Sequence, residues 1–243
     1  MGTLLAHLLV AYITLAAPWV GRFKYRQLQR QIAAQTEGAR GRFYRLAVLQ
    51  QIARIAVVLL ICLLDGVQPV ALGLTKPNSW QTTVASLGGL LLVVIVSTVW
   101  FRHRGDKQLR RLQKSIGALI PTSPSERIWF SLIGFNAGIS EELVFRGFLF
   151  YYLRTYTPIV DVAWMLVITS AVFAFCHLYQ GMRGVFLTGL FGVCAGMLYL
   201  GSGSLLLPMA VHAMVDLRLV FILTPRRLQL LQQSKAAAAG ATT

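Results

Sequence analysis

The sequence predicts an all-α protein, a polytopic bundle of about seven transmembrane helices with a polar pocket inside the membrane. Hydrophobic residues make up 56% of its 243 residues and charged residues only 13%, about half the charged share that is usual in a soluble domain. The charges are also segregated. Eight of the 23 Lys and Arg residues lie between Arg22 and Arg54, and six more lie between Arg102 and Lys114. Apolar stretches that separate basic blocks are typical of multi-pass membrane proteins.

A helix needs about 20 mostly apolar residues to cross the hydrocarbon core. The candidate spans are 4–20, 55–73, 83–101, 128–153, 158–177, 184–201 and 204–223. No positive segment precedes the first stretch, which favours a first span over a cleaved signal peptide. We expect a single integral-membrane domain over 1–243. Residues 1–124 would supply additional spans and basic cytosolic loops, and residues 125–225 would form the core that carries the motifs.

The basic blocks predict how the chain is oriented. The positive-inside rule places the linkers 21–54 and 102–127 in the cytosol and residues 74–82 outside. Within the first linker, residues 23–35 have the pattern of an amphipathic interfacial helix. At the end of the second loop we expect Ser123 or Ser125 to cap the next helix, with Pro124 in its first turn. The composition is typical of a multi-pass protein of a bacterial inner membrane.

The net charge of +15 could indicate nucleic-acid binding. The basic residues, however, form blocks between apolar segments rather than a patch on a folded soluble surface. They are better interpreted as anchors beside the anionic headgroups of the lipid bilayer. We therefore expect no nucleic-acid partner.

Three of the predicted spans carry polar or aromatic side chains at one-turn spacing. They are Glu141, Glu142 and Arg146 in the fourth span, Phe173 and His177 in the fifth, and His212 and Asp216 in the seventh. Residues four apart lie on one face of a helix. Charges are costly in hydrocarbon, so such side chains usually face the bundle interior and find partners there. The three groups should therefore meet in one pocket.

A pocket of this composition can perform a limited set of reactions. A glutamate can accept a proton from water, and imidazoles can orient that water or donate to a developing oxyanion. No serine lies in a nucleophile motif such as G-x-S-x-G. Zinc is possible, because two histidines and one or two carboxylates can bind it, but no H-E-x-x-H helix supports that alternative. We expect no metal and no other cofactor.

In this order, E-E-x-x-x-R, F-x-x-x-H and H-x-x-x-(N or D) resemble the motifs of the CAAX-protease and bacteriocin-processing family. Its members are intramembrane endopeptidases, typified by the CAAX prenyl endopeptidase of the Ras-converting type. The resemblance covers residues 125–225. It implies that Glu141 activates water together with His177, and that His212 and Asp216 form an oxyanion site.

The resemblance leaves other side chains in supporting roles. Glu142 and Arg146 would serve structure or substrate positioning, and a buried ion pair between them is the simplest interpretation. Phe173 would pack at the floor of the pocket. Asp216 departs from the pattern, because the better-studied proteases carry Asn at this position and Asp donates a hydrogen bond only when protonated. It either carries a proton or orients His212.

The sequence thus favours an intramembrane peptidase that takes a peptide or protein substrate from the cytosolic leaflet. A prenylated CAAX substrate is not expected in a bacterium. The alternative is a non-catalytic membrane scaffold, or a bacteriocin-immunity-type binding protein that retains the pocket. A proton-coupled transporter is less favoured, since the chain shows no inverted repeat. The sequence indicates no particular oligomeric state.

Overall fold

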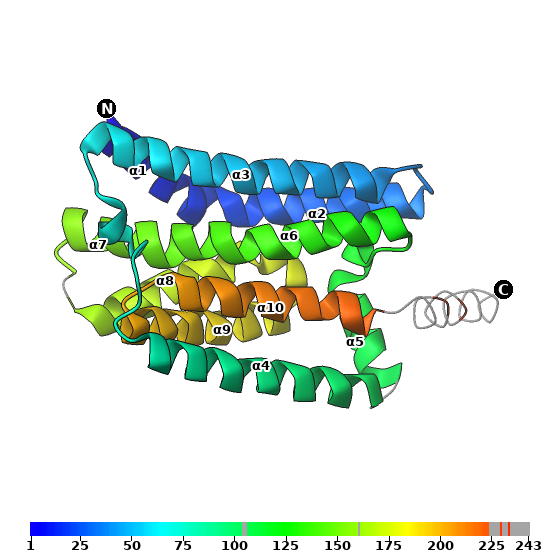
Figure 1. Cartoon of the computed structure of the whole chain (residues 1–243). Coiled ribbons are helices and arrows are strands. Elements are labelled where there is room, and N and C mark those ends of the chain that lie inside the picture. Colours follow the sequence, from blue (N-terminus) through cyan, green and yellow to red (C-terminus); the bar gives the residue numbers. More distant parts are fainter. Residues whose placement is uncertain (104–105, 160, 224–228, 230–232, 234–243) are drawn as a thin grey trace.

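The computed structural model describes residues 1–103, 106–159, 161–223, 229 and 233. Within these residues the regular secondary structure is entirely helical. Seven helical runs lie side by side, and successive runs point in opposite directions (Figure 1). The predicted all-α transmembrane bundle is therefore confirmed.

The first run is continuous and joins α1 (Gly2–Ala11), a π-helical segment (Tyr12–Ala16) and α2 (Ala17–Ala33). The other runs are α3 (Ala39–Asp65), α4 (Trp80–His103), α6 with the π-helical segment η4 and α7 (Pro124–Glu142, Leu143–Phe148, Leu149–Tyr156), α8 (Val162–Cys176), α9 (Gly181–Ser202) and α10 (Leu206–Ile222). Short elements connect them: the 3-10 turns Pro69–Leu72, η3 (Gly117–Leu119) and η5 (Leu178–Gln180), and the helix α5 (Asp106–Ile116).

Five helices in the described ranges are long and apolar enough to cross a membrane. They are Gly2–Ala33, Ala39–Asp65, Trp80–Phe101, Pro124–Tyr156 and Leu178–Ser202. The other two predicted spans correspond to α8, with 15 residues, and α10, with 17. At 1.5 Å per residue each is shorter than the roughly 30 Å hydrocarbon core. Both short helices carry residues of the predicted pocket.

The helix expected in the basic stretch 21–54 is present, but the stretch is not a linker between spans. Its residues continue α2 and begin α3, and only 34–38 form the turn between these helices. The predicted second span, 55–73, is present but with different bounds, because α3 already begins at Ala39 and ends at Asp65. Arg, Lys and Gln are good helix formers, and their long side chains can reach water from within a membrane helix. The hydropathy of the sequence therefore marked the edge of the apolar zone rather than the end of the helix.

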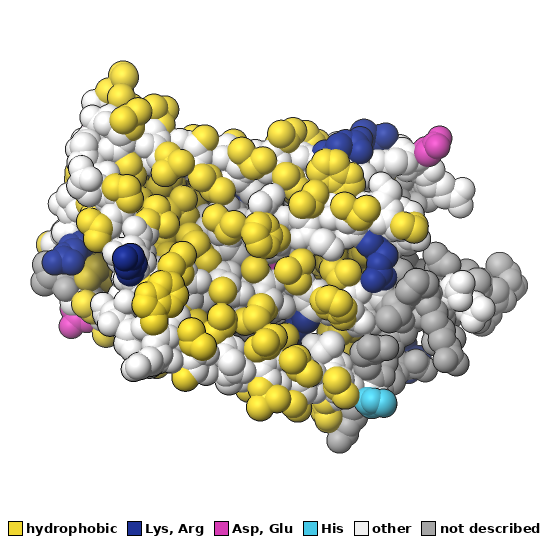
Figure 2. Space-filling model, viewed as in Figure 1, with side chains coloured by type: hydrophobic (Ala, Val, Ile, Leu, Met, Phe, Trp, Pro, Cys, Tyr) yellow, Lys and Arg dark blue, Asp and Glu magenta, His cyan; other side chains and the backbone are white. Residues whose placement is uncertain are grey.

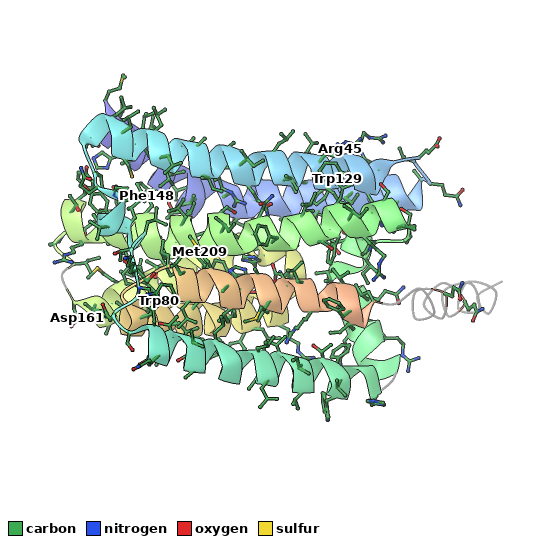
Figure 3. The ribbon with its side chains drawn as sticks, viewed as in Figure 1. Arg45, Trp80, Trp129, Phe148, Asp161 and Met209 are labelled. Atoms are coloured by element: carbon green, nitrogen blue, oxygen red, sulfur yellow. The ribbon has the colours of Figure 1, made fainter. Side chains whose placement is uncertain are left out.

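At one end of the bundle lie the parts of the helices that carry the two basic blocks of the sequence. This basic end is formed by the turn 34–38, α5 and η3. Figure 3 shows Arg45 near it, whereas Trp80 and Asp161 lie toward the opposite end. Between the two ends, apolar side chains cover a broad face (Figure 2). Such a surface suits lipid rather than water, and the chain is an integral, multi-pass membrane protein.

The helices that carry the pocket residues pack closely. A Cβ atom added at Gly138 in α6 would lie 2.7 Å from the backbone nitrogen of Ala213 and 2.8 Å from the carbonyl oxygen of Met209 in α10. Small residues permit this backbone approach between membrane helices. The contact brings the glutamates of α6 against His212. At the start of α6, Ser123 caps the helix by accepting from the backbone N–H of Glu126, as predicted.

Candidate active site

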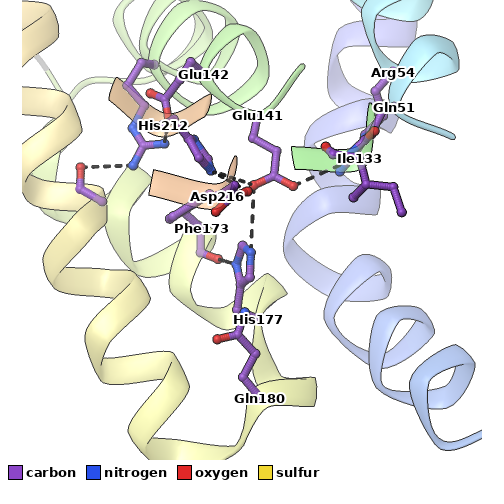
Figure 4. A network of polar contacts seen from close by, with 12 residues as sticks. Gln51, Arg54, Ile133, Glu141, Glu142, Phe173, His177, Gln180, His212 and Asp216 are labelled. Atoms are coloured by element: carbon purple, nitrogen blue, oxygen red, sulfur yellow. Dashed lines mark hydrogen bonds and ion pairs between the residues drawn. The ribbon is translucent and has the colours of Figure 1, made fainter. Parts of the chain in front are cut away.

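The three groups of side chains that the sequence singled out meet around Glu141 (Figure 4). Its Oε2 atom lies 3.8 Å from Nε2 of His177 and 3.9 Å from Nε2 of His212. Both distances exceed a direct hydrogen bond, and polar groups at such a separation are commonly bridged by water. The carboxylate and both imidazoles can therefore form hydrogen bonds to one small molecule that lies between them.

Glu142 lies behind His212. Its Oε1 atom accepts hydrogen bonds from Nδ1 of His212 at 2.7 Å and from Nη1 of Arg146 at 2.9 Å. The side chains of Glu142 and Arg146 are both fully buried, so the expected ion pair is present. Nη2 of Arg146 also donates to the carbonyl oxygen of Gly192 at 3.0 Å. Glu142 thus contacts the imidazole as well as the guanidinium.

The backbone at this point is π-helical from Leu143 to Phe148, directly after the two glutamates. π-helical segments inside α-helices are frequent at functional sites. Phe173 packs against the same region. The guanidinium carbon of Arg146 lies 4.4 Å from the centre of its ring, a cation–π distance. Phe173 is buried, and its ring contacts that of His212 edge-on. It therefore packs against both Arg146 and His212.

His177 is the C-terminal cap of α8. Its Nδ1 atom lies 2.8 Å from the carbonyl oxygen of Phe173, which can only accept a hydrogen bond. Nδ1 must therefore carry the proton. In the neutral ring the lone pair is then on Nε2, the atom that faces Glu141. This local bond fixes both the ring orientation and the tautomer.

Asp216 lies at the more open side of the cluster. Its Oδ2 atom is 3.8 Å from Nε2 of His212, and 38% of its side chain is exposed. His212 therefore has Glu142 at one ring nitrogen, and Glu141 and Asp216 at the other. Whether Asp216 carries a proton or orients His212 stays a prediction.

The sequence analysis did not anticipate Arg54, which comes from α3. Its Nη2 atom lies 4.0 Å from Oε1 of Glu141, and its side chain is 31% exposed. Gln51, one turn earlier, donates to the carbonyl oxygen of Ile133 at 3.1 Å and so ties α3 to α6. The only signal in the sequence was that these two polar residues interrupt the apolar pattern of α3.

A cavity of about 450 Å³ opens beside the cluster. Glu141, His177 and Arg54 line it, together with Lys24 of α2 and Tyr44 of α3. Its volume is in the range of sites that bind small ligands. In the described part of the chain, no group of three or more His, Cys, Asp or Glu side chains is placed to hold a metal ion.

Taken together, the fold and the site define a multi-pass membrane protein with a cluster of two glutamates, two histidines and an aspartate between its helices. Residues 123–218 match a family model described as Rce1-like, Type II CAAX prenyl endopeptidase Rce1-like. Comparisons with curated proteins and with solved structures gave no match. The matched segment includes every predicted site residue and excludes Arg54. It confirms that this segment resembles the CAAX-protease and bacteriocin-processing family.

Proposed function

We propose that the protein is an intramembrane peptidase that hydrolyses a peptide bond with a water molecule activated by Glu141. The observation that carries the proposal is the placement of Oε2 of Glu141 at 3.8 and 3.9 Å from Nε2 of His177 and of His212, next to a cavity. A water at this point can donate one proton to the carboxylate and the other to His177. Both contacts strengthen its oxygen as a nucleophile.

His212 would stabilise the oxyanion that forms when the water oxygen attacks the carbonyl carbon. Its Nδ1–H already donates to Glu142, so Nε2 can donate only when the ring carries both protons. The nearby carboxylates of Glu142 and Asp216 would balance the charge of such a ring. When the C–N bond breaks, Glu141 would return the proton to the leaving amine. The reaction then needs no covalent intermediate with the protein.

The substrate would be a peptide or protein segment that enters from the basic end. The cavity links the glutamate to residues of α2 and α3, whose basic blocks favour a cytosolic position under the positive-inside rule. Its lining combines Tyr12, Ile13, Val57, Phe130 and Phe145 with a few polar groups. An amphipathic or lipid-anchored peptide would suit that surface. The literal CAAX substrate is not part of this proposal.

The decisive experiment is turnover of a fluorogenic peptide library by the purified full-length protein, with Glu141→Ala as the control. Cleavage by the parent and none by the variant would support the proposal. Binding of peptides without cleavage, at the same affinity in both proteins, would favour the non-catalytic binding protein instead.

A further inference from the structure

A second cavity, of about 320 Å³, lies between α2, α5 and η5. Three basic side chains line it, Arg22 and Arg26 from α2 and Lys114 from α5, and its lining contains no acidic residue. Arg22 and Arg26 are four residues apart and so lie on the same face of α2. The cavity therefore gathers positive charge from two separate helices.

Its walls are held together by hydrogen bonds between the elements. The hydroxyl of Tyr25 donates to the carbonyl oxygen of Ser115 at 3.0 Å, and the hydroxyl of Ser115 donates to the carbonyl oxygen of Gln180 at 2.9 Å. These bonds link α2, the end of α5 and η5 around the cavity. The space is therefore built by the fold rather than left between mobile side chains.

Within the described part of the chain the three cations have no counter-ion. Among the described residues, none of the six ion pairs involves Arg22, Arg26 or Lys114. Like charges brought together in this way repel one another, and an external anion would relieve the repulsion. The arrangement thus suits a ligand that carries concentrated negative charge, such as a phosphate group.

The cavity also lies at the level where lipid headgroups are expected. α5 carries Leu109, Leu112 and Ile116 at helical spacing, with basic residues between them, the pattern of a helix that lies in the membrane interface. In Figure 1 this helix lies at the basic end of the bundle. Basic pockets between helices at this level are known binding sites for anionic headgroups.

We propose that this cavity binds the phosphate of an anionic phospholipid from the leaflet at the basic end. Tyr25 and Tyr179 line both this cavity and the larger one that contains Glu141. A bound headgroup would therefore lie beside the active-site cavity and complete one of its walls. The binding itself does not depend on the proposed peptidase activity.

The test compares full-length protein with the variant Arg22→Gln/Arg26→Gln/Lys114→Gln. Native mass spectrometry in detergent would measure the binding of phosphatidylglycerol and of phosphatidylcholine. The matched control is Arg30→Gln/Arg42→Gln/Arg45→Gln, which removes three exposed charges from the same part of the chain but leaves this cavity unchanged. We expect the cavity variant to lose phosphatidylglycerol affinity by roughly fivefold per charge, with little change in the control.

Three results would overturn the proposal. An equal loss in the control variant would show general attraction to anionic lipid rather than a site. Equal binding of phosphatidylcholine by the parent would show that the headgroup charge is not recognised. Inorganic phosphate that binds in this cavity and is not displaced by phosphatidylglycerol would identify a free anion as the ligand. If the triple variant fails to fold, the single variants Arg22→Gln in α2 and Lys114→Gln in α5 provide the same test.

Discussion

Nδ1 of His212 lies 2.7 Å from Oε1 of Glu142, the same oxygen atom that Nη1 of Arg146 contacts at 2.9 Å. One buried carboxylate oxygen thus serves both a structural ion pair and an imidazole of the candidate active site. A carboxylate at one ring nitrogen sets the orientation and tautomer of a histidine, and so determines what the other nitrogen can do. Glu142 is therefore placed to act through His212, without contact with the reacting atoms.

The first prediction separates the two neighbouring glutamates. Glu142→Gln should lower the free energy of unfolding by about 3–5 kcal/mol, because Arg146 would lose its direct ion-pair partner in a fully buried position. His212 would also lose its anionic partner, so the turnover rate should fall as well. Thermal unfolding in detergent and the steady-state rate would measure the two effects, with the exposed Glu37→Gln as the matched control.

Glu141→Gln should have the opposite effect: a large loss of turnover rate and a small loss of stability. The amide cannot accept the proton of water, and general-base catalysis is typically worth about 10²- to 10⁴-fold in rate. Its contacts lie at 3.8–4.0 Å, so the melting temperature should change little. A large loss of stability in Glu141→Gln combined with an unaffected rate, and the reverse in Glu142→Gln, would show that the two roles are exchanged.

The second prediction concerns Arg54, which approaches Oε1 of Glu141 while Oε2 faces the histidines. If the guanidinium orients the carboxylate, Arg54→Gln should lower kcat more than it raises KM, and Arg54→Lys should restore part of the rate. Steady-state kinetics on one cleaved peptide would measure this, with Arg45→Gln as the control. A change in KM alone would show that Arg54 contacts the substrate instead.

Much of the site follows from spacing in the sequence. Glu141 and His212 lie in apolar helices and His177 lies at the end of one, where an isolated polar group is costly, so their convergence was predictable. Arg54 was not predictable in the same way. It closes a block of basic residues, and its neighbour Arg45 is exposed whereas Arg54 faces the cavity. Only the packing of α3 against α6 distinguishes the two arginines.

The bounds of the first helices show a second limit. Hydropathy locates the apolar zone of a membrane helix, whereas the helix itself continues as long as its backbone bonds are satisfied and its residues tolerate the conformation. Residues 21–33 and 39–54 are helical, so α2 and α3 extend past the apolar zone. The contribution of Glu142 to His212 was likewise visible only once α6 and α10 were in contact.

The third prediction is the orientation of the bundle. Gln35 lies in the turn at the basic end, and Ser79 precedes α4 at the opposite end. If the basic end is cytosolic, a single cysteine at Ser79 should react with a membrane-impermeant thiol reagent in intact cells, and one at Gln35 should react only after lysis. The native cysteines would be replaced first. Labelling of position 35 from outside would reverse the orientation.

The fourth prediction is that activity requires no metal. Glu141 and the two histidines can together supply a base and a hydrogen-bond donor without one. Metal analysis of the purified protein and activity after chelation would test this, and we expect turnover to survive the chelator. Stoichiometric zinc, with activity that is lost on chelation and restored by zinc, would contradict it. Glu141, His177 and His212 would then be the candidate ligands.

The last prediction concerns Asp216, whose Oδ2 atom lies 3.8 Å from Nε2 of His212. An ionised Asp216 beside an oxyanion site would repel the developing negative charge. Two arrangements avoid this. Asp216 can carry a proton and donate to the oxyanion as Asn would, or it can remain ionised and pair with a doubly protonated His212, which strengthens the donation from Nε2.

Asp216→Asn distinguishes the two arrangements. If Asp216 is a protonated donor, the variant should keep its activity and extend it to higher pH, because an amide does not lose its donor when the pH rises. If Asp216 pairs with His212, the variant should be slower, since the imidazole loses a carboxylate that balances its charge. We favour the first, because the family pattern accepts Asn at this position. The measurement is the pH–rate profile of the variant against the parent, and a large loss of rate at every pH in a folded variant would rule out the donor role.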